Sequence, residues 1–149
     1  MELILQKRRL KMQRIKLTTN LCLDEYIPKD LYLKYISKPH ILIGLLDKRL
    51  IEADQKLRDI FGSVTINNWW QGGPRNWSGI RTPESPDYSY TSQHTFGRAS
   101  DKIFSVPASE VRAYIRLHYK ELGITCIEDN VTWVHSDVRY WQGTELLIV

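Results

Sequence analysis

Residues 107–122 carry the strongest helical pattern in the chain, and together with the apolar stretches that follow they constrain the fold more than any other feature. The apolar residues recur at the spacing of one helix face: Val111, Tyr114, Ile115 and Leu122. Pro107 suits the first turn of a helix, and Gly123 is a common residue just after the last turn. The pattern therefore predicts a helix over 107–122 with one face packed against other elements.

Two apolar stretches after this helix predict a pair of strands. Residues 124–127 and 131–141 are rich in β-branched and aromatic side chains, and the Glu-Asp-Asn sequence at 128–130 is typical of a turn. A short loop of this kind joins antiparallel strands. We therefore expect the chain after the helix to form a small antiparallel sheet.

Helical patterns also precede this region. Residues 47–61 have apolar side chains at helical spacing, with Asp47 as a plausible cap and Gly62 as a stop. Residues 29–37 show a weaker helical pattern, and residues 64–66 read as a short strand. The order of elements predicts an α+β fold, in which a small antiparallel sheet has flanking helices.

Residues 69–90 have no periodic pattern, because glycine and proline interrupt them repeatedly. A loop this long inside a compact domain is uncommon and often has a function. It contains five large aromatic residues: Trp69, Trp70, Trp77, Tyr88 and Tyr90. These side chains either stack on a substrate or pack the loop against the body of the protein, and both interpretations stay open.

The length of 149 residues predicts one domain over 1–149, with a basic segment at about 1–20. No apolar run approaches the roughly 20 residues that a membrane-spanning helix needs. The first apolar stretch is too short for a secretory signal and its basic residues follow it, so we expect no signal peptide and a cytoplasmic origin or another route of delivery. Cys22 and Cys126 have no CxxC spacing and are expected to be buried free thiols.

The formal net charge is +4, and much of the excess lies near the N-terminus. The basic residues there are Lys7, Arg8, Arg9, Lys11, Arg14 and Lys16. Such a run either attracts a polyanion or is simply solvated. Because the chain has no nucleic-acid-binding signature beyond charge, nucleic acid is not the expected partner.

Two short segments carry candidate metal ligands. In the first, SQHTFGRASD, His94 and Asp101 are separated by Gly97, which allows the sharp turn that would let the two side chains converge. In the second, WVHSDVR, His135 and Asp137 point to the same face if the segment is a strand. Imidazole nitrogen and carboxylate oxygen are zinc ligands, and a catalytic zinc site uses three protein ligands with one open position.

The joint pattern S-x-H-x-x-G-x-A-x-D, followed further on by an aromatic residue and x-H-x-D, resembles the zinc D-alanyl-D-alanine peptidases. That family includes peptidoglycan carboxypeptidases, dipeptidases of vancomycin resistance and phage endolysins, and it shares its fold with the hedgehog signalling domain. The resemblance covers about residues 45–141 and implies His94, Asp101 and His135 as ligands of one zinc ion. It also implies that Arg81, in the sequence SGIR, holds a substrate carboxylate or carbonyl oxygen.

The activity that the resemblance implies is zinc-dependent hydrolysis of peptide bonds, with a carboxylate as proton acceptor. Thr132 and Trp133 stand where many relatives have an acid or a histidine, so the acceptor must come from elsewhere. Asp137 is the first candidate, although it could instead brace a metal ligand. Glu128 or Asp129 in the preceding turn is the second candidate, and a site without a base is the third.

The resemblance thus predicts a peptidase that acts on the stem peptides or crosslinks of bacterial peptidoglycan, as a carboxypeptidase or an endolysin-type endopeptidase. The small size fits a phage lysis enzyme or a virion component. A non-catalytic zinc-binding protein of the same fold is the alternative, and a basic nucleic-acid-binding module is a third reading. The sequence does not indicate an oligomeric state or which peptide bond is cut.

Overall fold

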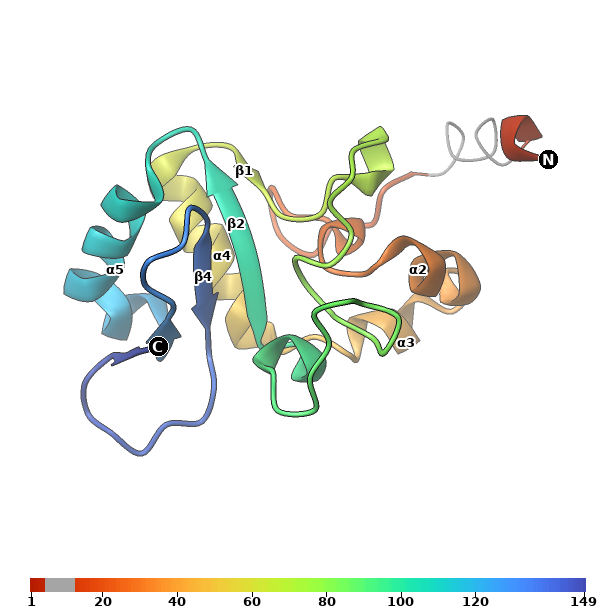
Figure 1. Cartoon of the computed structure of the whole chain (residues 1–149). Coiled ribbons are helices and arrows are strands. Elements are labelled where there is room, and N and C mark those ends of the chain that lie inside the picture. The colour runs from red at the N-terminus through yellow and green to blue at the C-terminus, as the bar shows by residue number, and fades with distance from the viewer. Residues whose placement is uncertain (5–12) are drawn as a thin grey trace.

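The computed structural model describes residues 1–4 and 13–149 (Figure 1). Most of the basic segment predicted at the N-terminus, including Lys7, Arg8, Arg9 and Lys11, lies outside the described residues. Of the remaining basic residues, Arg14 forms an ion pair with the buried Asp24, at 2.7 Å between Nη2 and Oδ2. Among the described residues, no helix has the length and apolar character needed to cross a membrane.

The fold is α+β, with a five-stranded sheet and flanking helices, as the pattern of elements predicted. The helices are α2 (Lys29–Tyr35), α3 (Pro39–Ile43), α4 (Lys48–Phe61) and α5 (Ala108–Leu122), and the short 3-10 helices are η1 (Leu23–Glu25), η2 (Trp69–Gln71) and η3 (Gln93–Phe96). The strands are β1 (Val64–Thr65), β2 (Ala99–Phe104), β3 (Cys126–Ile127), β4 (Val134–Asp137) and β5 (Leu147–Ile148).

The strand order is β1-β2-β4-β3-β5, and all neighbouring pairs are antiparallel except β3 and β5. The prediction of a purely antiparallel sheet is therefore wrong at this edge. Cys126 lies opposite Asp137 at the end of β4 and also opposite Leu147 at the start of β5. Because the loop of residues 138–146 crosses past β3 to its far side, β5 begins level with the start of β3 and runs in the same direction (Figure 1).

The main core lies where α4 and α5 cover the sheet (Figure 1). Its buried members come from both helices, from the strands and from the turn between α5 and β3: Ala53, Leu57, Phe104, Val111, Ile115, Leu122, Ile124, Ile127 and Val134. Asp47 caps α4 by accepting a hydrogen bond from the backbone N–H of Arg49, as predicted. Pro107 is the residue just before α5 rather than part of its first turn, and Gly123 ends α5 in the left-handed conformation.

The aromatic residues at the start of the long loop pack against the body of the protein. Trp69 is buried, and its indole N–H donates to the carbonyl of Ile27 at 2.9 Å. Tyr32 contacts both Trp69 and Trp70 edge-on, with ring centroids 5.2 and 5.9 Å apart. For these two tryptophans, packing is therefore the correct interpretation. Tyr90, further along, is exposed.

Gly97, which ends η3, occupies a position that no other residue can fill without strain. Its φ of +68° is in the left-handed region, and a Cβ at this position would overlap the carbonyl oxygen of Leu45. Gly123 has a similar φ of +77°, but a Cβ there would meet nothing within 4 Å. An alanine at Gly123 would therefore carry only the cost of the left-handed backbone, whereas an alanine at Gly97 would carry that cost and the cost of a steric overlap.

We expect Gly97→Ala to lower the free energy of unfolding by about 3 kcal/mol, the sum of left-handed strain and overpacking. Gly123→Ala is the matched control and should cost roughly 1–2 kcal/mol, because only the backbone term applies. Urea unfolding of both variants measures the difference. Equal losses would show that the Leu45 contact relaxes freely and does not constrain the turn.

Candidate metal centre

Three side chains predicted as metal ligands converge on one point: His94 from η3, Asp101 from β2 and His135 from β4. Their ligand atoms all lie within 4.8 Å of one another, and all three residues are buried. Asp101 and His135 face each other directly across the β2–β4 pair. The structure therefore brings together residues that are far apart in the sequence, as the motif predicted.

The two histidines present different nitrogens to the same carboxylate oxygen. His94 Nε2 lies 3.4 Å from Asp101 Oδ1, and His135 Nδ1 lies 3.0 Å from it. On its other side, His94 Nδ1 is 2.8 Å from the carbonyl oxygen of Gly79. A carbonyl oxygen only accepts, so Nδ1 carries a proton, and Nε2, which faces the centre, is the nitrogen that would bind a metal ion through its lone pair.

Asp101 is held by several groups at once. Its Oδ2 accepts a hydrogen bond from Arg81 Nη2 at 2.8 Å, and its backbone N–H donates to the carbonyl of Ser78 at 2.8 Å. Burial alone would raise the pKa of Asp101, but hydrogen bonds with His135 and His94 outweigh it and hold the pKa well below the ordinary value. The carboxylate is therefore ionised, as a metal ligand must be.

The chemistry of these three residues fits a divalent metal ion. Two imidazole nitrogens and one carboxylate oxygen form a donor set that zinc and other first-row divalent metals accept. The three ligands leave a further coordination position free for water or substrate. The buried His-Asp-His group can therefore hold a metal ion, and the identity of that ion is part of the proposal below.

The centre opens into a polar cavity of about 430 Å³. Besides the three ligands, the cavity is lined by charged and aromatic side chains, which include Arg81, Glu128, Trp133 and Arg139. Arg81 thus lies beside the ligands, where the motif predicted it. Its Nε donates to the carbonyl of Trp77 at 2.9 Å, so part of its guanidinium group anchors the long loop.

Asp137 lies behind His135 and does not line the cavity. Its Oδ2 is 2.9 Å from His135 Nε2, on the side of the ring opposite Asp101, and the residue is fully buried. Arg139 donates to both of its carboxylate oxygens, at 2.8 and 2.7 Å. Burial would raise the pKa of Asp137, but the hydrogen bonds with Arg139 and His135 lower it to about 2. This geometry is that of a residue that orients a metal ligand.

The two acids of the predicted turn have different surroundings. Glu128 lines the cavity, and its backbone N–H donates to the carbonyl of His135 at 3.3 Å. Asp129 is instead engaged by α5, with Arg116 Nη2 at 2.7 Å and Arg112 Nε at 3.4 Å. Of the two acids, Glu128 is therefore the one placed beside the metal ligands.

Sequence reasoning missed two contacts of the centre. The bidentate pairing of Arg139 with Asp137 was detectable, because His135, Asp137 and Arg139 alternate along one strand and its extension. The hydrogen bond between Gly79 and His94 joins residues that no local pattern connects, so nothing in the sequence indicated it.

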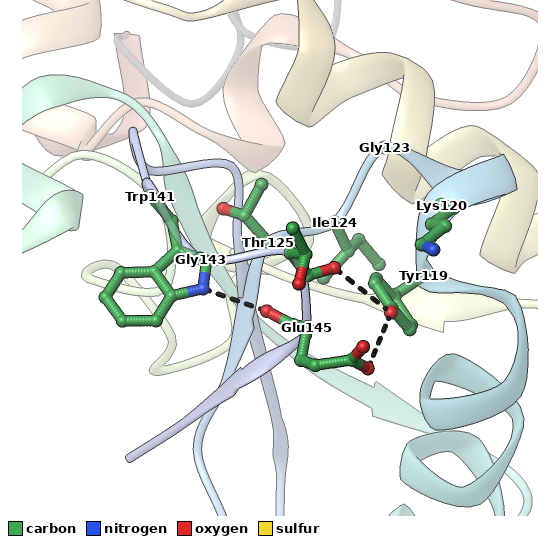
Figure 2. A pocket seen from close by; sticks show the side chains of 9 residues that line it. Tyr119, Lys120, Gly123, Ile124, Thr125, Trp141, Gly143 and Glu145 are labelled. Atoms are coloured by element: carbon green, nitrogen blue, oxygen red, sulfur yellow. Dashed lines mark hydrogen bonds between the residues drawn. The ribbon is translucent and has the colours of Figure 1, made fainter.

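A separate cavity of about 280 Å³ lies between α5 and the loop of residues 138–146 (Figure 2). Its walls include Tyr119, Trp141 and Glu145, and it contains none of the predicted site residues. The indole N–H of Trp141 donates to the carbonyl of Glu145 at 2.8 Å (Figure 2). The hydroxyl of Thr125, which also lines this cavity, donates to the carbonyl of Arg139 at the start of the loop, at 2.7 Å.

No protein-family model, curated protein or solved structure matches the chain.

Proposed function

We propose that this chain is a zinc-dependent peptidase that hydrolyses peptide bonds of bacterial peptidoglycan and has a fold of the hedgehog and D-alanyl-D-alanine peptidase type. The observation that carries the proposal is the convergence of His94, Asp101 and His135 in one polar cavity. These residues come from the two segments whose joint motif resembles that family. A small sheet with flanking helices is compatible with the proposed fold.

In the proposed reaction, the bound zinc ion supplies a water of lowered pKa and polarises the scissile carbonyl. His94, Asp101 and His135 would hold the ion, because His94 Nε2, Asp101 Oδ1 and His135 Nδ1 face one another. Arg81 keeps Asp101 Oδ2 engaged and lines the cavity, where its guanidinium group is placed to bind a substrate carboxylate or carbonyl oxygen.

Glu128 is the proton acceptor in this proposal. Glu128 lines the cavity, and in this proposal its carboxylate takes a proton from water and returns it to the leaving amine. Asp137, the first candidate from the sequence, has both oxygens engaged by Arg139 and His135 and a pKa of about 2, far below that of an efficient base at neutral pH. We therefore assign Asp137 the role of orienting His135.

The proposed substrate is the stem peptide or crosslink of peptidoglycan, and the proposed setting is a phage lysis system or a virion component. Both follow from the resemblance of the motif. The alternative is a zinc-binding protein without catalytic activity, and the digestion of peptidoglycan described next distinguishes it from the proposed peptidase.

Digestion of purified peptidoglycan tests the proposed function. The zinc-loaded protein is expected to release new amino groups, a chelator should abolish the release, and added zinc should restore it. New amines are measured by chemical labelling, and mass spectrometry of the fragments identifies the bond that is cut. Bound zinc without any release of amines would contradict the peptidase proposal and favour the non-catalytic alternative.

A further inference from the structure

A buried network of charged and hydroxyl groups lies directly behind the metal ligand Asp101. Asp54 of α4 and Lys102 of β2 form an ion pair, with 2.9 Å between Oδ1 and Nζ. The hydroxyls of Ser100 and Tyr26 both donate to Asp54 Oδ2, at 2.6 and 2.9 Å. All four residues are fully buried. None of them lines the cavity of the metal centre, so the proposed reaction does not use them directly.

The network faces the opposite side of β2 from the metal centre. Ser100 and Lys102 flank Asp101 in the strand, and side chains alternate between the two faces. Asp101 therefore points toward the histidines while its two neighbours point toward α4. Any shift of the network moves the backbone segment that carries the metal ligand.

Lys102 is bound in a way that fixes this backbone. Its ammonium group donates to Ser100 Oγ at 2.6 Å and to the Ser100 carbonyl at 3.0 Å, in addition to its pairing with Asp54. Two of the three N–H donors of the ammonium group are thus used by Ser100, and Asp54 Oδ1 lies beside the group as its opposite charge. The Ser100 carbonyl belongs to the same peptide unit as the N–H of Asp101, which donates to the Ser78 carbonyl. The peptide unit before the ligand is thus held at both ends.

A buried ion pair is by itself weak evidence of a contribution to stability, because apolar side chains of similar volume often serve as well. Its directional bonds, however, define a position more sharply than apolar packing does. The side chains that bind a metal ion must be positioned this sharply, since productive sites tolerate displacements of only about 0.5 Å.

We propose that Asp54 and Lys102, together with Ser100, are positioning residues of the metal centre, which set the place of the Asp101 carboxylate and thereby the affinity for the metal ion. The inference rests on the metal-binding part of the proposed function. It is independent of whether the protein cuts peptide bonds.

The test measures zinc affinity by competition with a chromogenic chelator, and thermal unfolding of the metal-free protein, for each variant. The double variant Asp54→Leu with Lys102→Met removes both charges together, so no unpaired charge stays buried. We expect it to unfold at a lower temperature than the wild type in the presence of chelator, because the buried Ser100 and Tyr26 hydroxyls lose their acceptor, while its zinc affinity falls about 10–100-fold. Ser100→Ala, which removes one hydroxyl and leaves the ion pair, should lower zinc affinity by a smaller factor.

Leu57→Ala is the matched control, because Leu57 lies one turn after Asp54 on α4 and belongs to the apolar core. It should lower the unfolding temperature and leave zinc affinity near that of the wild type. Unchanged zinc affinity in both test variants would overturn the inference, and if the double variant does not fold, Ser100→Ala alone decides. A wild-type protein that binds no zinc would instead overturn the metal site itself, an outcome visible without any variant.

Discussion

Zinc is expected to be nearly absent from His135→Ala protein purified without chelators, whereas the wild type should carry about one ion per chain. His135 Nδ1 is one of the three ligand atoms, and its loss leaves two ligands from separate elements and an unfilled space in a buried site. Elemental analysis of both proteins measures the difference, and release of amines from peptidoglycan should fall with the zinc content.

His118→Ala is the control for this experiment, because His118 lies on α5, away from the centre, and is paired with Glu121 at 3.3 Å. It should retain the zinc content of the wild type. If wild-type protein contains no zinc even after reconstitution, the proposed function is wrong. If His135→Ala keeps its zinc, the ligand assignment is wrong, and other side chains must hold the ion.

Glu128→Gln is expected to lower the rate of peptide hydrolysis about 10²–10⁴-fold, the range for loss of a positioned proton acceptor. The amide has nearly the same shape as the carboxylate and cannot take up the proton. Zinc content should stay at the wild-type level, because Glu128 is not one of the three ligands. The measurement is the initial rate of amine release at saturating zinc.

Two neighbouring acids supply the controls for Glu128. Asp129→Asn should keep most of the activity, since Asp129 is paired with α5. Asp137→Asn should bind zinc about 10–100-fold more weakly and regain activity at high zinc concentration, as expected for a residue that only orients His135. The assignments of base and orienting residue would be reversed if zinc-saturated Asp137→Asn were inactive and Glu128→Gln were active.

The parts of the fold that the sequence predicted well are those with regular amphipathic spacing. The helices α4 and α5 were placed to within one residue at their N-termini, since their apolar faces pack on the sheet. β2 escaped prediction because its sequence, ASDKIF, buries a serine, an aspartate and a lysine that satisfy one another or the metal centre. No helix was predicted at α3, because five residues give too short a pattern to detect.

In the candidate site, too, some features could be predicted from the sequence and others could not. The resemblance of the joint motif to a known family grouped His94, Asp101 and His135, which the structure brings together. The choice between Asp137 and Glu128 required the structure, because both lie near His135 in the chain. Asp137 is buried and paired with Arg139, whereas Glu128 lines the cavity, and this difference is the ground for the different roles that we propose for them. The Asp54–Lys102 pair joins positions that no short pattern links.

Because Asp101 lies opposite His135, a metal ion bound by both residues would also test whether the two strands are correctly aligned. Sliding β2 by one residue against β4 would turn Ser100 and Lys102 toward the cavity and drive Asp101 toward α4, since side chains alternate between faces. Such a misaligned chain would lose the carboxylate ligand. Because a ligand stabilises only the form that binds it, zinc would draw the population toward the correctly aligned sheet. The ion would thus help to select the native alignment before it takes part in any reaction.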